Sequence, residues 1–137
     1  METVIVYRSI LGITKKYATW LAEDLKADLF TFNKVEQVDW SAYDAVIIAS
    51  GTYASWMPLT GFLKKHWPIL KDKKVIVVSV GISPEDTPYT RQILEKIPEE
   101  IRKTVKIVRL PGAIFGKTPS ETGVVKRENI KKVIKFV

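Results

Sequence analysis

The chain has 137 residues, 46% of them hydrophobic, which suffices for one domain with a single buried core. It has no cysteine, which excludes disulfides, thiolate nucleophiles and iron–sulfur clusters held by its own cysteines, so redox activity would need a bound organic cofactor. The formal net charge is +7, but no arginine-rich or aromatic-interleaved tract is present, and we expect no nucleic-acid binding.

The chain up to residue 50 predicts three strands and one helix. Strands are predicted at Thr3–Tyr7 and Ala45–Ser50, which are rich in valine and isoleucine. The run Val46–Ala49 is apolar at consecutive positions, which suits a parallel strand covered on both faces. Between these two strands, Thr14–Ala27 has apolar residues at spacings of three and four and predicts an amphipathic helix. Asp28–Phe32 alternates between polar and apolar residues and predicts a strand at a sheet edge.

The rest of the chain continues the alternation of strands and helices. Further strands are predicted at Lys74–Val80 and Val105–Leu110. A helix is predicted from Pro58 to Trp67, and Pro68 ends it. The next helix starts at Asp86 or Thr87, runs through Leu94 and is broken into two pieces at Pro98. The last predicted helix is Glu128–Val137. This order argues for one α/β domain, residues 1–137, with helices on both faces of a five-stranded parallel sheet.

The last predicted helix contains the densest basic cluster. Its members are Lys126, Arg127, Lys131, Lys132 and Lys135. Their helical spacing predicts a solvated helix face, with an acidic protein partner or a membrane surface as the alternatives. No apolar run reaches eighteen residues and the start METVIVYRS does not resemble a signal peptide, so we expect a soluble, cytoplasmic protein with no transmembrane segment.

In a doubly wound sheet, ligands bind beyond the carboxyl ends of the strands. The loop after the first strand is Ser9-Ile10-Leu11-Gly12-Ile13-Thr14, and it runs directly into a helix. A phosphate there would meet free backbone N–H groups at the positive end of the helix, with the Ser9 and Thr14 hydroxyls as further donors. Alternatively, Gly12 makes a tight turn and Thr14 caps the helix. The loop matches neither the dinucleotide nor the P-loop fingerprint, so a single phosphate fits best.

Two further loops lie at the same predicted edge. The first is Gly51-Thr52-Tyr53-Ala54-Ser55-Trp56-Met57-Pro58, in which Tyr53 or Trp56 could cover a flat heteroaromatic ring while backbone groups contact its polar edge. In the alternative interpretation both aromatic side chains pack on the sheet edge. The second is Gly81-Ile82-Ser83-Pro84, which suits one wall of a ligand slot or an ordinary loop.

The loop Ser9–Thr14 resembles the phosphate loop of the flavodoxin family, S/T-x-S/T-G-x-T. It matches at Ser9, Gly12 and Thr14 and departs at Leu11, where a hydroxyl is usual, and at Ile13, often asparagine. The similarity to the family extends over essentially the whole chain. It implies a flavodoxin-like three-layer α/β/α sandwich with strand order 2-1-3-4-5 and a flavin mononucleotide (FMN) cofactor.

The loop Gly51–Pro58 resembles the Y-x-G-x-M-P variant of a second loop in the family. It matches at Tyr53, Met57 and Pro58, with Ser55 in place of the glycine. The residues that the resemblance assigns to FMN binding are Ser9, Ile10, Leu11, Gly12, Ile13, Thr14, Thr52, Tyr53, Ala54, Ser55, Trp56, Gly81 and Ile82. The segment Gly112–Lys117 resembles the end of the family's last strand and the following loop, and would border the flavin or a partner.

A closer similarity is to the flavodoxin-like branch that includes menaquinone-dependent protoporphyrinogen oxidase. Asp39–Asp44, the strand start Ala45–Ile48 and Phe62–His66 carry it. That enzyme has a longer chain, with an extra loop and a basic C-terminal helix that are not found here. His66 is the chain's one histidine, and we expect a structural or surface role for it and no metal site.

Three functions follow from these observations. The first is an FMN-binding electron-transfer protein without catalytic side chains, whose redox protein partner would be acidic because this chain is basic. The second is an FMN-dependent oxidoreductase of the protoporphyrinogen-oxidase-like branch, acting on a quinone or a small organic substrate. The third is a flavin-free binding module, which Leu11, Ile13 and Ser55 favour. A phospho-receiver is disfavoured, because Ser9 and Ser50 stand where it needs acidic residues.

Overall fold

The computed structural model describes residues 2–112 and 123–137. Its centre is one sheet of five parallel strands in the order β2-β1-β3-β4-β5. The strands are β1 (Thr3–Arg8), β2 (Asp28–Thr31), β3 (Ala45–Gly51), β4 (Lys74–Gly81) and β5 (Lys106–Pro111). The flavodoxin-like sandwich and the predicted strand order are therefore confirmed.

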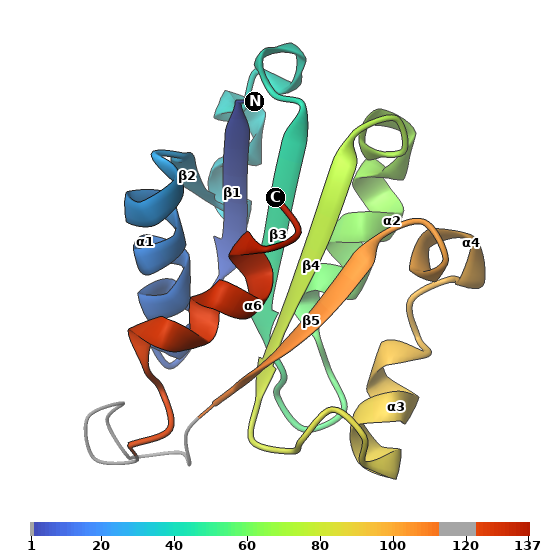
Figure 1. Cartoon of the computed structure of the whole chain (residues 1–137). Coiled ribbons are helices and arrows are strands. Elements are labelled where there is room, and N and C mark those ends of the chain that lie inside the picture. Colours follow the sequence, from blue (N-terminus) through green and yellow to red (C-terminus); the bar gives the residue numbers. More distant parts are fainter. Residues whose placement is uncertain (1, 113–122) are drawn as a thin grey trace.

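Helices cover both faces of the sheet (Figure 1). They are α1 (Ile13–Leu25), α2 (Pro58–Leu70), α3 (Pro88–Leu94), α4 (Glu99–Arg102) and α6 (Lys131–Ile134), with 3-10 segments η1 (Phe32–Gln37), η2 (Trp40–Ala42) and η3 (Arg127–Ile130). α1 and α6 lie on one face, and α2, α3 and α4 on the other. Within the described residues, no helix combines the length and hydropathy that crossing a bilayer requires.

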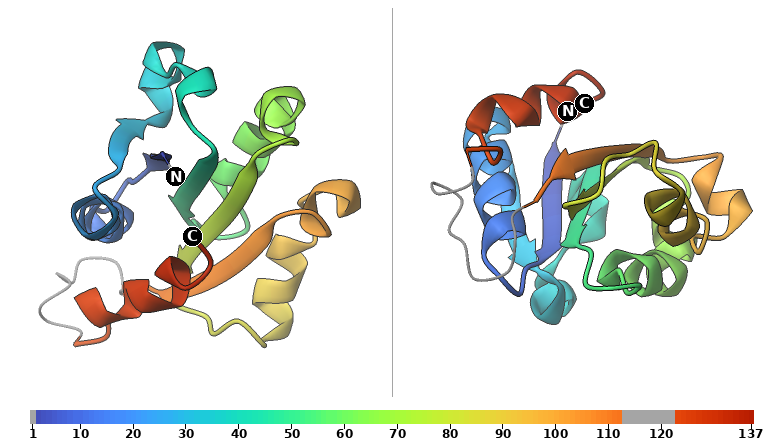
Figure 2. Two further views of the ribbon diagram at one scale, coloured as in Figure 1. Left: turned by 45° about the horizontal axis from the view of Figure 1, so that its top comes forward. Right: turned by 90° about the horizontal axis from the view of Figure 1, so that it is seen from below.

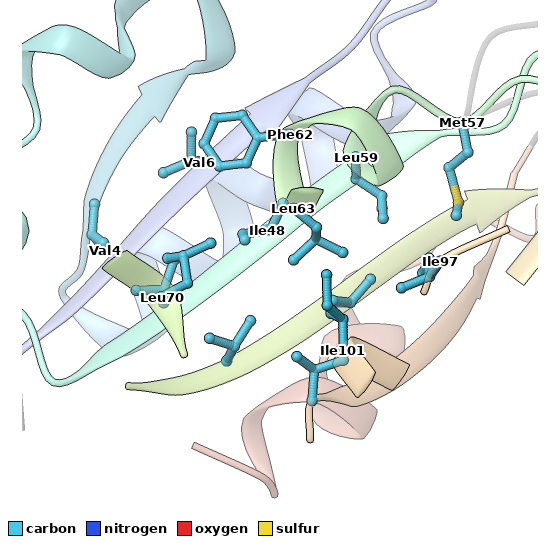
Figure 3. Packing of buried hydrophobic residues seen from close by; sticks show 14 of the residues in the cluster. Val4, Val6, Ile48, Met57, Leu59, Phe62, Leu63, Leu70, Ile97 and Ile101 are labelled. Atoms are coloured by element: carbon cyan, nitrogen blue, oxygen red, sulfur yellow. The ribbon is translucent and has the colours of Figure 1, made fainter. Parts of the chain in front are cut away.

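The core has two halves because neighbouring residues of each central strand face opposite sides of the sheet. Val46 and Ile48 of β3 pack toward α2, whereas Ile47 and Ala49 pack toward α1, and all four are fully buried. Figure 3 shows the half that α2 covers, where Leu59, Leu63 and Leu70 lie over β1, β3 and β4. Burial on both faces explains why these strands are apolar at consecutive positions.

The helix α1 ends two residues before the predicted Ala27. Its last residue is Leu25, because Lys26 adopts a left-handed conformation with φ 52° and donates its N–H to the carbonyl of Ala22. Tyr17, Ala18 and Leu21 form its buried stripe, at the predicted spacing.

The helix α2 does not end at Trp67, so that prediction was wrong. It continues through Pro68 to Leu70, and the N–H of Lys71 still donates to the carbonyl of Trp67 at 2.9 Å. Pro68 cannot donate to the carbonyl four residues earlier. That carbonyl belongs to Lys64, on the exposed side of α2, where water can replace the lost donor, while Leu70 is fully buried. Burial of the final turn therefore outweighs the proline.

Two other boundaries differ from the sequence prediction. Phe32 belongs to η1 and not to β2, and its ring stacks on Phe62 of α2 at 4.3 Å between centroids. The helix predicted over Glu128–Val137 is shorter, because it starts as η3 and regular α-helix covers Lys131–Ile134.

The five clustered basic residues of this region are all exposed, and Arg127 pairs with Asp24 on α1. The break at Pro98 is confirmed, between α3 and α4.

Candidate functional site

A cavity of about 640 Å³ opens at the carboxyl edge of the sheet, the edge seen from below in the right panel of Figure 2. Its walls are the loops after β1, β3 and β4, and the ends of β4 and β5. The lining residues are Ser9, Ile10, Leu11, Ile13, Thr14, Gly51, Thr52, Tyr53, Ala54, Val80, Gly81, Ile82, Ser83, Tyr89, Arg109 and Gly112. This volume is in the range of small-molecule binding sites.

One end of the cavity is the N-terminus of α1. Gly12 is its N-cap and has φ 88°, a conformation that glycine adopts without strain. The first helical bond runs from the N–H of Lys16 to the carbonyl of Gly12 at 3.1 Å, so three earlier N–H groups have no partner within the helix. No side chain of the described residues caps them. The interpretation of Thr14 as the cap was wrong, since Thr14 lies inside the first turn, buried against the cavity.

The hydroxyl of Ser9 is engaged within its own loop. It accepts a hydrogen bond from the N–H of Gly12 at 3.1 Å and so closes the turn before the helix. The carbonyl and N–H groups of the loop are thereby held next to the start of α1, where the helix dipole favours an anion.

The side chain of Tyr53 joins the loop after β3 to the loop after β1. Its hydroxyl accepts a hydrogen bond from the N–H of Ile10 at 3.0 Å. To reach that position the ring lies across Gly51, and a Cβ atom there would be 2.5 Å from the Tyr53 hydroxyl oxygen. Gly51 at the end of β3 is thus required by the aromatic side chain above it.

The residues Tyr53–Trp56 form a tight turn at the mouth of the cavity. The N–H of Tyr53 donates to the carbonyl of Trp56 at 2.7 Å, and the reverse bond measures 2.9 Å. Ala54, and not Ser55, has the positive φ of this turn, 54°. The carbonyl of Ala54 accepts from the hydroxyl of Tyr89, and that of Ser55 accepts from Nζ of Lys96 at 2.8 Å. Side chains from α3 and the turn after it therefore hold this loop in place.

The wall opposite α1 contains Arg109 of β5, which is only 7% exposed. Its Nη1 donates to Oγ1 of Thr52 at 2.8 Å and to Oγ of Ser79 at 2.7 Å, and its Nε donates to the carbonyl of Ser83 at 3.1 Å. Burial lowers the pKa of Arg109 from its ordinary value. None of the described carboxylates forms an ion pair with it.

Sequence reasoning did not identify Arg109. Its strand, Val105–Leu110, was predicted correctly, and an arginine within such an apolar run was the available signal. β5 is an edge strand, however, and in an edge strand a charged residue is ordinarily solvated. The loops that enclose Arg109 come from β3 and β4, and the sequence does not show that enclosure.

The structure brings most of the predicted site residues together around this one cavity. The exceptions are Gly12, Ser55 and Trp56, which do not line it. Gly12 and Ser55 are next in sequence to lining residues, and the backbone of Trp56 is hydrogen-bonded to that of Tyr53, which lines the cavity. The lining residues not predicted as binding residues are Gly51, Val80, Ser83, Tyr89, Arg109 and Gly112. Gly112 begins the segment Gly112–Lys117, whose residues 113–117 lie outside the described part of the chain.

The rim of the cavity is apolar and exposed. Ile82, Ile10, Trp56, Leu11 and Tyr89 are the exposed large hydrophobic residues there, at 62, 52, 50, 46 and 43%. The guanidinium of Arg8 lies 5.2 Å from the centroid of the Trp56 ring. His66 is not part of this surface, since it packs on Phe62 in α2 with ring centroids 4.3 Å apart.

Two flavodoxins and a Trp repressor binding protein are among the solved structures that share this architecture. A flavodoxin from the domain Archaea is 20% identical, with a TM-score of 0.62 and 99% of each chain covered. Flavodoxin 2 from Bacillus cereus is 19% identical, with a TM-score of 0.58 over 98% of this chain and 99% of that one. The Trp repressor binding protein from Bacillus subtilis is 11% identical, with a TM-score of 0.63 over 94% and 96%. At these identities the similarity establishes the fold alone.

The sequence itself carries the family assignment. No curated protein sequence is significantly similar to the chain. The family model described as a flavodoxin domain matches residues 4–136, from β1 to beyond α6. That match covers nearly the whole chain, and the chain therefore belongs to the flavodoxin-domain family.

Proposed function

We propose that this protein binds FMN in the cavity and works as a cytoplasmic electron carrier between redox proteins. The observation that carries the proposal is the arrangement of the cavity, which joins an uncapped helix N-terminus at one end to a slot between two loops at the other. A phosphate suits the first end and a flat polar ring suits the second. The family assignment supports the same cofactor.

The N-terminus of α1 would hold the phosphate. The N–H groups of Ile13 and Thr14 precede the first helical hydrogen bond, and the Thr14 side chain lines the cavity beside them. These two N–H groups and the Thr14 hydroxyl would take the place of the side-chain hydroxyl that the family's phosphate loop usually has at the position of Leu11. The flavin ring would lie between Tyr53 and the loop after β4, where Gly81, Ile82 and Ser83 contribute backbone groups.

The lining favours electron transfer over acid–base catalysis. Among the described residues that line the cavity, the ionisable side chains are Tyr53, Tyr89 and Arg109, and none of the lining residues is a histidine, aspartate or glutamate, the most frequent general acids and bases. When bound, FMN supplies the capacity to accept and release electrons, and the protein binds, orients and shields it. The exposed apolar rim and the basic chain suit a partner whose docking surface is apolar at its centre and acidic around it.

One observation favours a second function. The same apolar rim, with Ile10, Ile82 and Tyr89 exposed, would admit a flat hydrophobic substrate next to the flavin. This fits an FMN-dependent oxidoreductase of the protoporphyrinogen-oxidase-like branch that acts on a quinone or a small organic molecule. Steady-state turnover of a quinone with a chemical reductant, and no protein partner, would distinguish this activity from that of a carrier.

The test of FMN binding is a titration with a matched pair of variants. The purified protein is incubated with excess FMN and freed of unbound flavin, and we expect an oxidised-flavin spectrum with about one FMN per chain. Thr14→Val should weaken FMN binding about tenfold, because it removes a donor to a charged group, while leaving riboflavin binding unchanged. Thr19→Val is the control, since Thr19 is an exposed residue of α1 that donates to the carbonyl of Lys15.

Two outcomes would contradict the proposal. A colourless protein that leaves FMN fluorescence unchanged would remove both redox functions and favour the flavin-free binding module. Equal losses of FMN affinity in Thr14→Val and Thr19→Val would show that the phosphate does not lie at the start of α1.

A further inference from the structure

We propose that Arg109 is a fixed cation at the ring end of the cavity that binds anionic reduced flavin more tightly than oxidised flavin and so raises the midpoint potential. This inference rests on the proposed function, because it assigns a role to Arg109 within the same site. It goes beyond FMN binding by stating which oxidation state the pocket favours.

The position of Arg109 places it at the ring end. The phosphate end belongs to the loop after β1, and β5 is separated from β1 by β3 and β4. The guanidinium contacts Thr52, in the loop after β3, and Ser83, in the loop after β4. These are the two loops between which the flavin ring would lie.

The guanidinium is held in one orientation. Three hydrogen bonds fix Nε and Nη1, and the Ser79 hydroxyl that accepts one of them contacts Sδ of Met57 at 3.2 Å. Nη2 lies directly over Gly81, where a Cβ atom would be 2.1 Å from it. The glycine at the end of β4 thus allows the cation to approach the cavity wall, and a cation fixed in advance needs no rearrangement when a ligand arrives.

The charge of Arg109 is not neutralised by the described part of the chain. The ion pairs found there both involve Arg127, on the opposite face of the sheet. Among the described residues, the hydrogen-bond partners of Arg109 are two hydroxyls and a carbonyl, which are neutral. A buried cation is costly unless an anion accompanies it, and one that lines a cavity with no anionic partner in residues 2–112 and 123–137 points to an anionic ligand group.

The reduced flavin ring would supply that anion. Oxidised flavin gains two electrons and one proton on reduction to its anionic form, with the proton at N5 and the negative charge shared by N1 and the neighbouring carbonyl oxygen. The electrons come from a reduced redox protein, or from dithionite in the test, and the proton comes from water. Arg109 would donate no proton, and its contribution would be a fixed positive charge at the ring end of the cavity.

The experiment compares dissociation constants for FMN in both oxidation states, measured anaerobically. Arg109→Gln should raise the ratio of the reduced-state constant to the oxidised-state constant about tenfold, which for a two-electron couple corresponds to a potential lower by about 30 mV. Arg109→Lys keeps the charge and should retain most of the preference. Arg91→Gln is the control, because Arg91 is exposed on α3 and does not line the cavity. Its removal changes the net charge by the same amount and otherwise removes one exposed hydrogen bond, from Nη2 to the carbonyl of Asp86 at 2.9 Å.

A measurement on the unmodified protein covers the case in which Arg109→Gln does not fold. If the bound reduced flavin stays anionic, one proton accompanies two electrons, and the midpoint potential falls by about 30 mV per pH unit from about pH 5 to pH 8. Tyr53 and Tyr89 are the other described titratable side chains that line the cavity. A slope of about twice that size would mean a neutral reduced flavin and would overturn the inference.

The outcomes separate this inference from FMN binding itself. If the unmodified protein binds FMN and Arg109→Gln weakens both oxidation states equally, Arg109 only shapes the pocket, and the inference fails while the proposed function stands. If the unmodified protein binds no FMN in either state, both fail. A loss confined to the reduced state, absent in Arg91→Gln, supports the inference.

Discussion

The hydroxyl of Tyr53 accepts a hydrogen bond from the backbone N–H of Ile10 at 3.0 Å, and this bond ties the aromatic loop to the loop proposed to hold phosphate. Tyr53→Phe removes the acceptor. We expect faster hydrogen exchange at the Ile10 amide and a loss of about 1 kcal/mol or less in the free energy of unfolding, because water can replace the partner at this exposed site. Amide exchange measured by NMR checks this.

The control for Tyr53→Phe is Tyr89→Phe, which releases the Ala54 carbonyl and leaves the Ile10 contact intact. Unchanged Ile10 exchange in Tyr53→Phe would mean that the hydroxyl does not hold the loop.

Gly81 and Gly61 should respond to alanine in opposite directions. A Cβ at Gly81 would lie 2.1 Å from Nη2 and 2.7 Å from Cζ of Arg109, whose three hydrogen bonds prevent it from moving aside. Gly81→Ala should therefore lower the free energy of unfolding by about 1–3 kcal/mol. Gly61 is exposed in α2 with no atom within 4 Å of such a Cβ, so Gly61→Ala should raise it by about 0.5–1 kcal/mol.

Urea unfolding of the two glycine variants checks whether the free energy of unfolding falls in Gly81→Ala and rises in Gly61→Ala. An equal change in both would show that backbone entropy, and not the contact with Arg109, governs the effect at Gly81.

Tyr17 links α1 to the C-terminal part of the chain. Its hydroxyl donates to the carbonyl of Pro111 at 2.6 Å and accepts from Nδ2 of Asn129 at 3.0 Å, and burial raises its pKa. Tyr17→Phe leaves both partners without this hydroxyl and should cost about 1–3 kcal/mol of stability. Asn129→Ala is a comparison that keeps the bond from Tyr17 to Pro111 and removes the bonds from Nδ2 to Tyr17 and to the carbonyl of Val124. A loss below about 0.5 kcal/mol for Tyr17→Phe in denaturant unfolding would contradict this.

The bond from Tyr43 to Asp28 makes stability sensitive to alkaline pH. The Tyr43 hydroxyl donates to Oδ2 of Asp28 at 2.6 Å, and this bond, with burial, raises the pKa of Tyr43 to about 12 from 10.0. Since the folded chain retains a proton that the unfolded chain loses, the stabilisation is complete below about pH 10 and is lost as the pH rises through about 12.

We therefore expect the free energy of unfolding to fall more steeply between about pH 10 and 12 in the unmodified protein than in Tyr43→Phe. Asp28→Asn should also reduce the slope, because it removes the main cause of the raised pKa. Parallel curves for the unmodified protein and Tyr43→Phe in urea unfolding would rule out this contribution.

The strands could be predicted from the sequence because a strand buried on both faces needs apolar residues at consecutive positions, and such a run is visible in the sequence itself. Runs such as Val46–Ala49 are apolar without interruption, and their boundaries shifted by only about a residue. The end of α2 could not be predicted in this way. Whether Pro68 ends the helix depends on the burial of Leu70 two residues later, which is a property of the packed sheet.

The loops of the cavity were also predictable, whereas its far wall was not. The spacing of Ser9, Gly12 and Thr14 before a helix predicts the phosphate-binding loop that we propose at this end of the cavity. Arg109 is marked in the sequence only by its place within an apolar run, because its hydrogen-bond partners Thr52 and Ser83 are distant in sequence and meet it only through the strand order.

The attachment of the turn at Tyr53–Trp56 has a consequence for how the pocket can be altered. Its carbonyls are held by Tyr89 and Lys96, which follow β4 and not β3. A substitution in this later segment can therefore shift the mouth of the pocket without touching any residue of the turn. If the pocket binds FMN as proposed, random mutagenesis that selects for altered flavin affinity should recover substitutions around residues 89–96 as well as substitutions in the turn.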